Sequence, residues 1–341
     1  MNAKNRLKKE SKDIKKKSFR GFNFGTFLGL AGIFILAFNF LNDLFSGKSK
    51  FSFYFLSIGL LILYIGIVMH FVAIGNRPFS KAWGFLKKIK KYAWFGFSIF
   101  VFTALIGFLF PYFFQEEIIN LIKELAAKTQ GLGGFELIRF IIFNNVKSSF
   151  FAIFFGFFSG VVPFFISIVN GYVLGFVANK TVLSEGILVL WRLFPHGILE
   201  IPAVMISIGL GLRIGMFPFY IKERARGFAA IILSFFIFGI LMGFAMFFFS
   251  LANSLSIENL NSFNLADSPL MKDSLHAVIF FIFYGLFFIF SIFIGLKILS
   301  VNDRKIVIEN IINSLLVFVF IVIPLLIVAG IIEGGLIWML E

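Results

Sequence analysis

The chain has 341 residues, of which 60% are hydrophobic and 55 are Phe, more apolar side-chain area than a water-soluble core of this length can bury. A water-soluble domain is therefore excluded, and a polytopic membrane protein is predicted. The net charge of +14 does not indicate nucleic-acid binding, because the basic residues form short clusters between apolar runs, as the positive-inside bias produces.

The first 21 residues are a basic segment that holds nine of the 31 Lys and Arg residues. The apolar run that follows is too long for a signal-peptide core and lacks a small-residue cleavage site. We expect the segment to remain as a cytoplasmic anchor. The chain is then a multi-pass protein of the cell membrane with its N-terminus in the cytoplasm.

Apolar runs long enough to cross a ~30 Å hydrocarbon layer as helix recur along the chain, and the period-two alternation of a membrane barrel is absent. The sequence predicts an all-α transmembrane bundle of about nine spans. Their expected ranges are 22–42, 53–74, 94–114, 147–161, 163–179, 196–213, 228–250, 277–297 and 313–337. The loops 75–92, 213–227 and 297–305 then fall inside, and they hold most of the remaining Lys and Arg residues.

Residues 115–145 have a different pattern, with apolar and charged side chains on opposite faces of a helix. This predicts an external amphipathic helix near 115–130 that lies on the bilayer. Glycines at 131–134 are expected to end it, and a second short helix from Phe135 is expected to lead into the next span. The apolar face consists of Ile118, Ile119, Ile122 and Leu125.

The stretch 180–195 is too short and too polar for a full crossing and too apolar for an ordinary loop. We expect a re-entrant half-helix there, within a broken helix near 181–213. Non-helical backbone at membrane depth is tolerated only where protein buries it or where it lines a wet cavity. Pro195, His196 and Gly197 are the expected break.

Ionisable side chains lie in or beside this hydrophobic stretch at Arg192, His196 and Glu200, and an intramembrane ionisable group is a candidate functional residue. His196 and Glu200 are four residues apart, so on a helix they share a face about 6 Å apart along the axis. The pair suggests a proton relay, an ion site or a contact for a partner's transmembrane segment. The alternative is that Glu200 pairs with Arg192 or His196 only to satisfy the charges at the break.

Two further polar residues belong to the predicted intramembrane polar site. Asn170 lies inside a span and either hydrogen-bonds between helices or joins the cluster around His196. Glu333 in the last span either meets this polar centre or hydrogen-bonds locally. Asn144 and Asn145 are expected to be a cap or an interfacial anchor, and Arg213 is expected to extend toward the cytoplasm.

Three Gly-x-x-x-Gly patterns, Gly156/Gly160, Gly171/Gly175 and Gly211/Gly215, fall between residues 156 and 215. Such patterns allow helix backbones to approach closely. The region is therefore predicted to be the tightly packed centre of the bundle. The residues expected to break the helix or to pack are Pro195, Gly197, Pro202, Gly171, Gly175, Gly211 and Gly215.

Catalysis is not expected. The chain has no Cys and only three His, at 70, 196 and 276, whereas a catalytic zinc needs three protein ligands. No Gly-x-Ser-x-Gly motif or intramembrane Ser/His pairing is evident. No metal or cofactor is predicted.

Several segments resemble the stage II sporulation protein M family of integral membrane proteins, over about 93–220 and 305–341. The most specific is Pro-His-Gly-Ile-Leu-Glu-Ile-Pro-Ala at 195–203. The others are Phe-Phe-Gln-Glu-Glu at 113–117, Asn145, Val-Asn-Gly-Tyr-Val-Leu-Gly at 169–175, Gly-Leu-Arg-Ile-Gly at 211–215 and Ala-Gly-Ile-Ile-Glu at 329–333.

The resemblance implies a non-enzymatic scaffold that works with peptidoglycan-degrading partners in spore-forming bacteria. We expect a membrane scaffold or assembly factor that contacts lipid and other membrane or envelope proteins, with no nucleic-acid partner. The alternative is a transporter or channel that uses His196 and Glu200. The expected organisation is a basic segment 1–21, an additional hairpin 22–92, a family-like core 93–220, an additional hairpin 221–304 with an external loop 251–275, and a closing helix 305–341.

Overall fold

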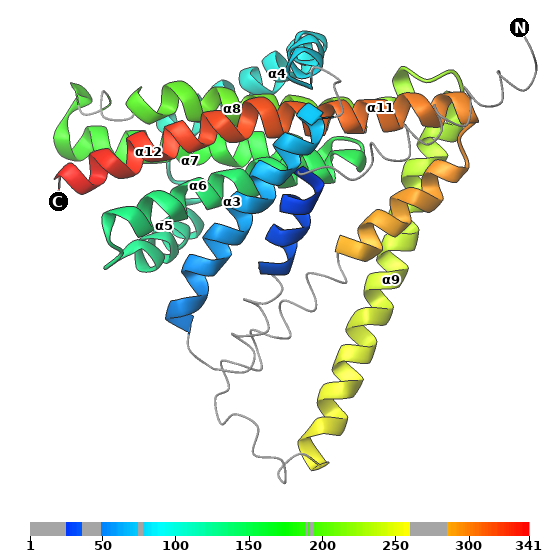
Figure 1. The fold of residues 1–341 in the computed structure, drawn as a ribbon. Coiled ribbons are helices and arrows are strands. Elements are labelled where there is room, and N and C mark those ends of the chain that lie inside the picture. The colour runs from blue at the N-terminus through cyan, green and yellow to red at the C-terminus, as the bar shows by residue number, and fades with distance from the viewer. Residues whose placement is uncertain are drawn as a thin grey trace, which may run out of the picture. The chain divides into compact units, whose positions relative to one another are not determined.

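The computed structural model describes residues 25–35, 49–73, 78–188, 190, 194–259 and 285–340. Within these ranges the chain is all-helical and contains no strand (Figure 1). Six helices are long and apolar enough to cross a membrane: Pro78–Leu109, Gly134–Phe157, Val161–Glu185, Gly197–Gly215, Arg224–Phe244 and Val301–Ile337. The other three predicted spans overlap shorter apolar helices, Gly25–Ile35, Leu61–His70 and Gly285–Lys297.

The chain divides into two compact units. The first consists of residues 1–80 and 244–286, and the second of residues 81–243 and 287–341. In the first unit, the helix Gly25–Ile35 packs against α3 (Ser49–Ala73) through glycines. Gly66 meets the backbone of Gly29, and Thr26 Oγ1 is hydrogen-bonded to His70 Nδ1 at 2.7 Å. Small residues therefore set the spacing of this helix pair.

The second unit is built around α8 (Phe194–Gly215), whose neighbours are α6 (Gly134–Phe154), α7 (Val161–Glu185) and α12 (Ile323–Leu340) (Figure 1). Ala203, Ile208 and Leu210 of α8 are fully buried. Pro195 lies in the first turn of α8, where a proline costs little because that N–H has no helical acceptor. The helix continues through Pro202 to Gly215.

The turn between α6 and α7 lies inside the stretch 147–161 that was predicted to be one span. The α-helix ends at Phe154 and continues as a 3-10 turn, η1 (Phe155–Phe157). Ser159 and Gly160 then have φ values of 56° and 69°, a left-handed backbone that glycine adopts readily. The pair Gly156/Gly160 is therefore part of a turn and not of a straight helix.

Two other helix boundaries differ from the sequence prediction. The expected short helix at Phe135 and the span after it are one continuous α6, which starts at Gly134, where the Gly133 N–H donates to Glu136 Oε2 at 3.4 Å. The expected half-helix 180–195 is divided, because residues 180–185 complete α7 and Gly186 ends it. Pro195, His196 and Gly197 were expected to break the helix, but they lie in the first turn of α8. Residues 191–193 lie outside the described part of the chain.

The amphipathic segment forms α5 (Gln115–Thr129), close to the predicted 115–130. It follows α4 (Pro78–Leu109), whose last carbonyls are held by α7. Tyr172 Oη donates to the Phe110 carbonyl at 2.7 Å, and Asn179 Nδ2 donates to the Phe108 carbonyl at 2.9 Å. These bonds satisfy C-terminal groups that a helix leaves without partners.

The remaining helices are α9 (Arg224–Asn259), which follows the short 3-10 helix η3 (Phe217–Phe219), the helix Gly285–Lys297 and α11 (Val301–Val317). Residues 251–259 of the expected external loop are helical, and 260–275 lie outside the described residues. A π-helical turn, η4 (Phe318–Val322), joins α11 to α12 just before Pro324. A wider turn relieves the clash of a proline ring with the preceding carbonyls.

Candidate functional site

The central polar residue of the candidate site is Glu200, which lies in the second turn of α8 and is half-buried. It lies beside the Asn145 side chain of α6, and Glu333 of α12 lines the same cavity. Both carboxylates come from helices that pack against α6. The second unit thus brings two acids together from positions 133 residues apart.

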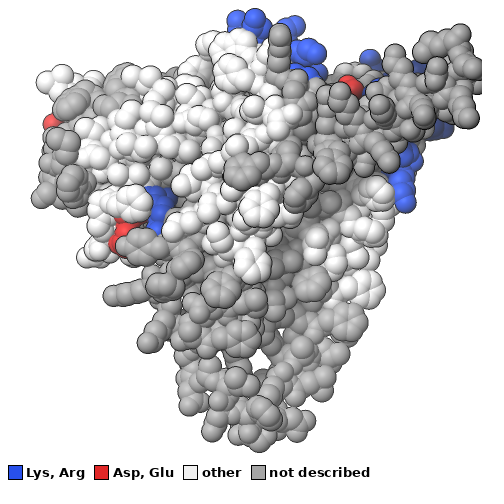
Figure 2. Space-filling model, in the orientation of Figure 1, with Lys and Arg blue, Asp and Glu red and all other residues white. Residues whose placement is uncertain are grey.

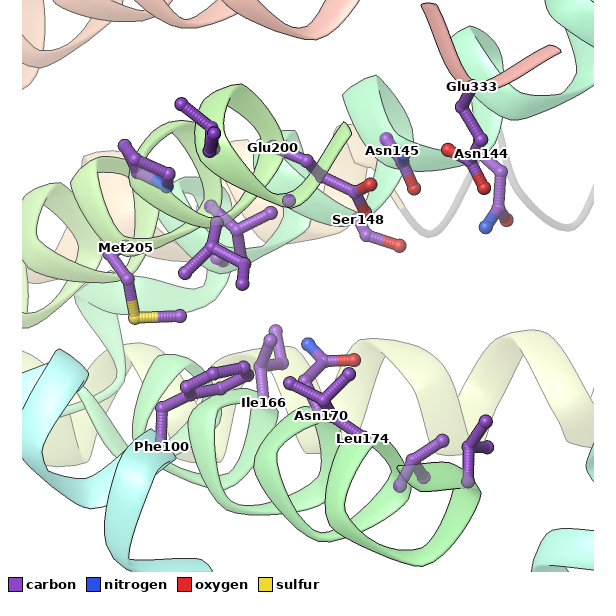
Figure 3. A pocket seen from close by; sticks show the side chains of 18 of the residues that line it. Phe100, Asn144, Asn145, Ser148, Ile166, Asn170, Leu174, Glu200, Met205 and Glu333 are labelled. Atoms are coloured by element: carbon purple, nitrogen blue, oxygen red, sulfur yellow. The ribbon is translucent and has the colours of Figure 1, made fainter. Parts of the chain in front are cut away.

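These residues line a cavity of about 760 Å³ between α6, α7, α8 and α12 (Figure 3). Its polar side chains are Asn144, Asn145, Ser148, Asn170, Glu200 and Glu333. In Figure 3, Glu200 points toward Ser148 and Asn145, and Asn170 faces the cavity from α7 on the opposite side. The remaining wall is mainly aliphatic and includes Ile166, Leu174 and Met205.

The cavity has an acidic character. Among its described lining residues there are two Glu and no Lys, Arg or His. Carboxylates accept hydrogen bonds, and amide side chains both donate and accept them. The arrangement can therefore hold a polar or cationic group next to an apolar wall, and it can hold a proton between two acids.

The predicted site residues are placed as follows. Asn170, Glu200 and Glu333 share the cavity, and Gly197 and Pro202 also line it. Arg192 lies outside the described residues, and of His196 only the backbone is described, in the first turn of α8. The predicted pairing of Glu200 with either of these two residues remains a prediction.

Three functional candidates were not identified from the sequence. Asn144 and Asn145 were expected to be a cap or an anchor, yet both line the cavity together with Ser148. Their spacing of one and four residues places them on one side of a helix. The sequence therefore indicated that the three side chains share a face. It did not indicate that this face lies against α8.

The glycines hold α8 against the α6–α7 turn. A Cβ on Gly211 would collide with the carbonyl oxygen of Ala152, and a Cβ on Gly215 would collide with the backbone of Gly160. Gly171 and Gly175 of α7 meet the backbone of α4 at Phe100 and Ala104 in the same way. The helix backbones therefore touch, with no side chains between them.

Arg213, at the other end of α8, does not simply extend toward water. Its Nε donates to Asn310 Oδ1 of α11 at 2.9 Å, and its guanidinium lies 5.1 Å from the Tyr220 ring centroid and 5.3 Å from that of Phe85. Such distances allow cation–π attraction. Burial raises the pKa of the Tyr220 phenol. Arg213 thus connects α8 to α4, α11 and the turn after η3.

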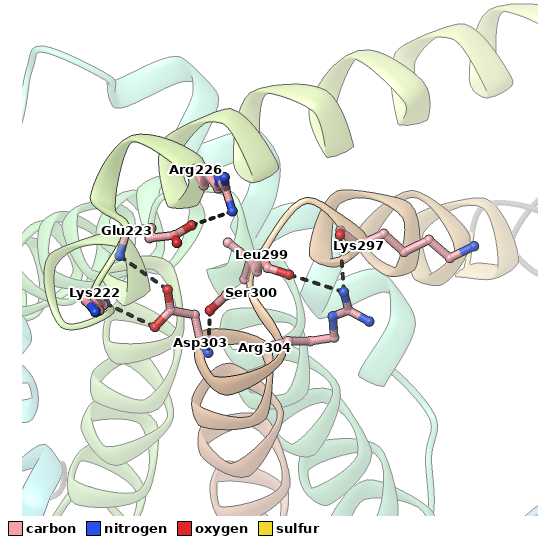
Figure 4. A network of polar contacts seen from close by, with 8 residues as sticks. All are labelled: Lys222, Glu223, Arg226, Lys297, Leu299, Ser300, Asp303 and Arg304. Carbon is pink, nitrogen blue, oxygen red and sulfur yellow. Dashed lines mark hydrogen bonds and ion pairs between the residues drawn. The ribbon is translucent and has the colours of Figure 1, made fainter.

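A second polar network joins the start of α11 to the segment before α9 (Figure 4). The Asp303 carboxylate, 2% exposed, accepts hydrogen bonds from the backbone N–H groups of Lys222 at 3.1 Å and Glu223 at 3.2 Å. Arg304 Nε donates to the Leu296 carbonyl at 3.0 Å. Asp303 and Arg304 bind backbone groups, and Glu223 pairs with Arg226 at 2.7 Å, so the network joins helix ends.

No group of three or more potential metal-ligating side chains occurs within the described ranges.

A family model described as stage II sporulation protein M matches residues 96–236. This segment runs from α4 into α9 and includes most of the cavity, all of α8 and the glycine contacts. The resemblance inferred from the sequence is confirmed for this segment, and the matched residues do not include 305–341. No curated protein and no solved structure matches the chain.

Proposed function

We propose that this multi-pass membrane protein is a non-enzymatic scaffold or assembly factor for envelope or membrane-remodelling partners. The observation that carries the proposal is the backbone contact of α8 with the α6–α7 turn and of α7 with α4. The proposal includes nine spans in the cell membrane and a cytoplasmic N-terminus, as the apolar runs and the basic clusters predict.

The backbone contacts support a rigid platform. A carrier with alternating access rocks one helical bundle against another around its substrate site. Here glycines hold α8 to η1 and α7 to α4, and packed interiors resist gradual deformation. Sliding α8 past Ala152 and Gly160 would separate backbones that are in direct contact. A fixed surface that positions other proteins suits this packing.

The surface that we assign to partners is on α5. Ile118 is buried against Tyr172 and Phe176 of α7 and anchors the first turn. The same apolar stripe continues with Leu121, Ile122 and Leu125, which are 41%, 37% and 37% exposed. An exposed apolar stripe beyond an anchored turn is suited to a protein groove or to the bilayer surface.

Crosslinking and pull-down from native membranes test this proposal. Leu121→Gln combined with Leu125→Gln removes the apolar stripe, whereas Lys123→Gln combined with Glu116→Gln changes the opposite face and is the matched control. We expect a defined set of proteins with the wild type and the control, and its loss with the stripe variant. Recovery of the protein alone, or an unchanged set with the stripe variant, would contradict the proposal.

The second candidate function is transport, and the cavity with its two acids favours it. Intramembrane carboxylates and interrupted helices form substrate and proton sites in many carriers. This alternative requires that purified protein in liposomes move an ion or small solute and that Glu200→Gln abolish the movement. Flux with that sensitivity would replace the scaffold proposal.

A further inference from the structure

A second cavity of the same unit has a different chemistry. It measures about 470 Å³ and lies between α4 and α8. Its wall is apolar except at two lysines, and no acidic side chain is among its described lining residues: Trp83, Leu86, Lys87, Lys90, Ala93, Trp94, Phe97, Ile201, Pro202, Met205 and Ile206. The groove is thus basic and apolar, in contrast to the acidic cavity around Glu200.

The α4 side of the groove is one stripe of the helix. Trp83, Lys87, Lys90, Trp94 and Phe97 are spaced by three or four residues and share a face. Trp83 and Trp94 are 50% and 57% exposed, and each lies one turn from a lysine. Tryptophan and lysine side by side are typical of the membrane–water interface.

The two helices run antiparallel beside this stripe. Gly209 meets Ala93, and the guanidinium of Arg213 lies over the Phe85 ring. The earlier residues of α8, Ile201 and Pro202, therefore lie toward the Phe97 end of the groove. The two lysines lie between Trp83 and Trp94, and the part of the groove beyond them, toward Phe97, is lined by hydrocarbon.

The level of the groove in the bilayer follows from the predicted span 94–114. Lys87 and Lys90 precede this span in the predicted cytoplasmic loop 75–92, at the level of the lipid headgroups. Trp94 and Phe97 begin the span and enter the hydrocarbon. The groove therefore leads from the headgroup region into the inner leaflet.

We propose that this groove binds a phospholipid with an anionic headgroup. Lys87 and Lys90 hold the phosphate region, because ammonium groups are effective donors to phosphate. One acyl chain lies along Trp94, Phe97 and Ile206, where it covers the exposed ring of Trp94 and the partly buried Phe97 and Ile206. The inference goes beyond the proposed function and does not depend on it, because a scaffold and a carrier would both keep the site.

Native mass spectrometry of the purified full-length protein tests the site by titration with dioleoyl phosphatidylglycerol or dioleoyl phosphatidylcholine. We expect preferential retention of the anionic lipid. Lys87→Gln combined with Lys90→Gln is expected to weaken this retention about tenfold or more, because each basic residue near an anionic lipid contributes appreciably to binding. Lys81→Gln combined with Lys88→Gln removes the same charge from the opposite face of α4 and is expected to stay within about twofold of the wild type.

Three outcomes would overturn the proposal. Equal retention of the two lipids would show that the headgroup charge is not recognised. An equal loss with both double variants would show a diffuse charge effect. Full competition by inorganic phosphate at concentrations that match the lipid would show an anion site without a role for the acyl chain. The comparison of the two wild-type titrations remains valid if a variant fails to fold.

Discussion

Glu200 and Glu333 illustrate at the residue scale how an intramembrane charge is accommodated. Two ionised carboxylates in a medium of low dielectric repel each other strongly, and Glu200 and Glu333 line the same cavity. The side-chain amide of Asn145, in the same cavity wall, can offset part of this cost by donating to Glu200. Without this amide, Glu200 would lose a polar partner at the cavity wall.

This arrangement predicts opposite effects for two substitutions of Glu200. Glu200→Gln keeps a side chain that can bond to Asn145 and removes the repulsion with Glu333, so we expect stability equal to or above that of the wild type. Glu200→Ala removes the polar group beside Asn145, so we expect a loss of about 1–3 kcal/mol. Thermal unfolding in detergent measures both, and equal destabilisation by the two variants would show that Asn145 does not interact with residue 200.

At the scale of elements, α8 owes its central position to glycines. Its contacts with the α6–α7 turn are contacts between backbones, at Gly211 with Ala152 and at Gly215 with Gly160. The turn itself requires left-handed residues at Ser159 and Gly160. The close approach of α8 to α6 and to the α6–α7 turn therefore depends on glycines in α8 and in the turn.

Gly211→Ala is expected to destabilise the protein by about 1–3 kcal/mol, because a methyl group would be forced against a backbone carbonyl that cannot move alone. Gly239→Ala is the matched control. A Cβ at Gly239 of α9 meets nothing within 4 Å, and alanine has the higher helix propensity, so unchanged or raised stability is expected. Chemical or thermal unfolding of the two variants would show the difference, and similar values would mean that the close approach is not required.

For the whole molecule, the central question is on which side of the membrane each segment lies. Lys and Arg side chains gather at the upper edge of the view, over α4, while α5 carries a pair of opposite charges, Glu124 and Lys128 (Figure 2). The basic first turns of α4 and the amphipathic α5 are separated by the long apolar remainder of α4. They are therefore expected on opposite faces of the membrane.

Because the chain has no cysteine, single introduced thiols report this topology without background. A membrane-impermeant maleimide added to intact cells should label the Asn120→Cys variant, on α5, and should label the Lys88→Cys variant, on α4, only after the cells are opened. Labelling of both from the same side would overturn the predicted orientation, while labelling with the two sides exchanged would invert it.

Local patterns in the sequence accounted for much of the fold. The described apolar helices overlap the predicted runs, and α5 lies where the amphipathic period indicated, because both signals depend only on neighbouring residues. Boundaries were predicted less well at α6, where no strong stop signal separates the early turns from the apolar part. The turn at Ser159 and Gly160 was predicted a few residues too late, between the spans 147–161 and 163–179, because its flanks are as apolar as a span.

By itself, the sequence determined that the protein is helical and multi-pass, where its apolar segments and amphipathic helix fall, and which block, 195–203, carries the resemblance to a known family. Only the tertiary structure decided that Asn145 meets Glu200, that Glu333 reaches the same cavity and that two lysines of α4 border a groove beside α8. The reason is physical. Hydrophobicity and periodicity are local properties of a chain, whereas the partners of a polar side chain depend on which helix faces touch, and that follows from packing over the whole bundle.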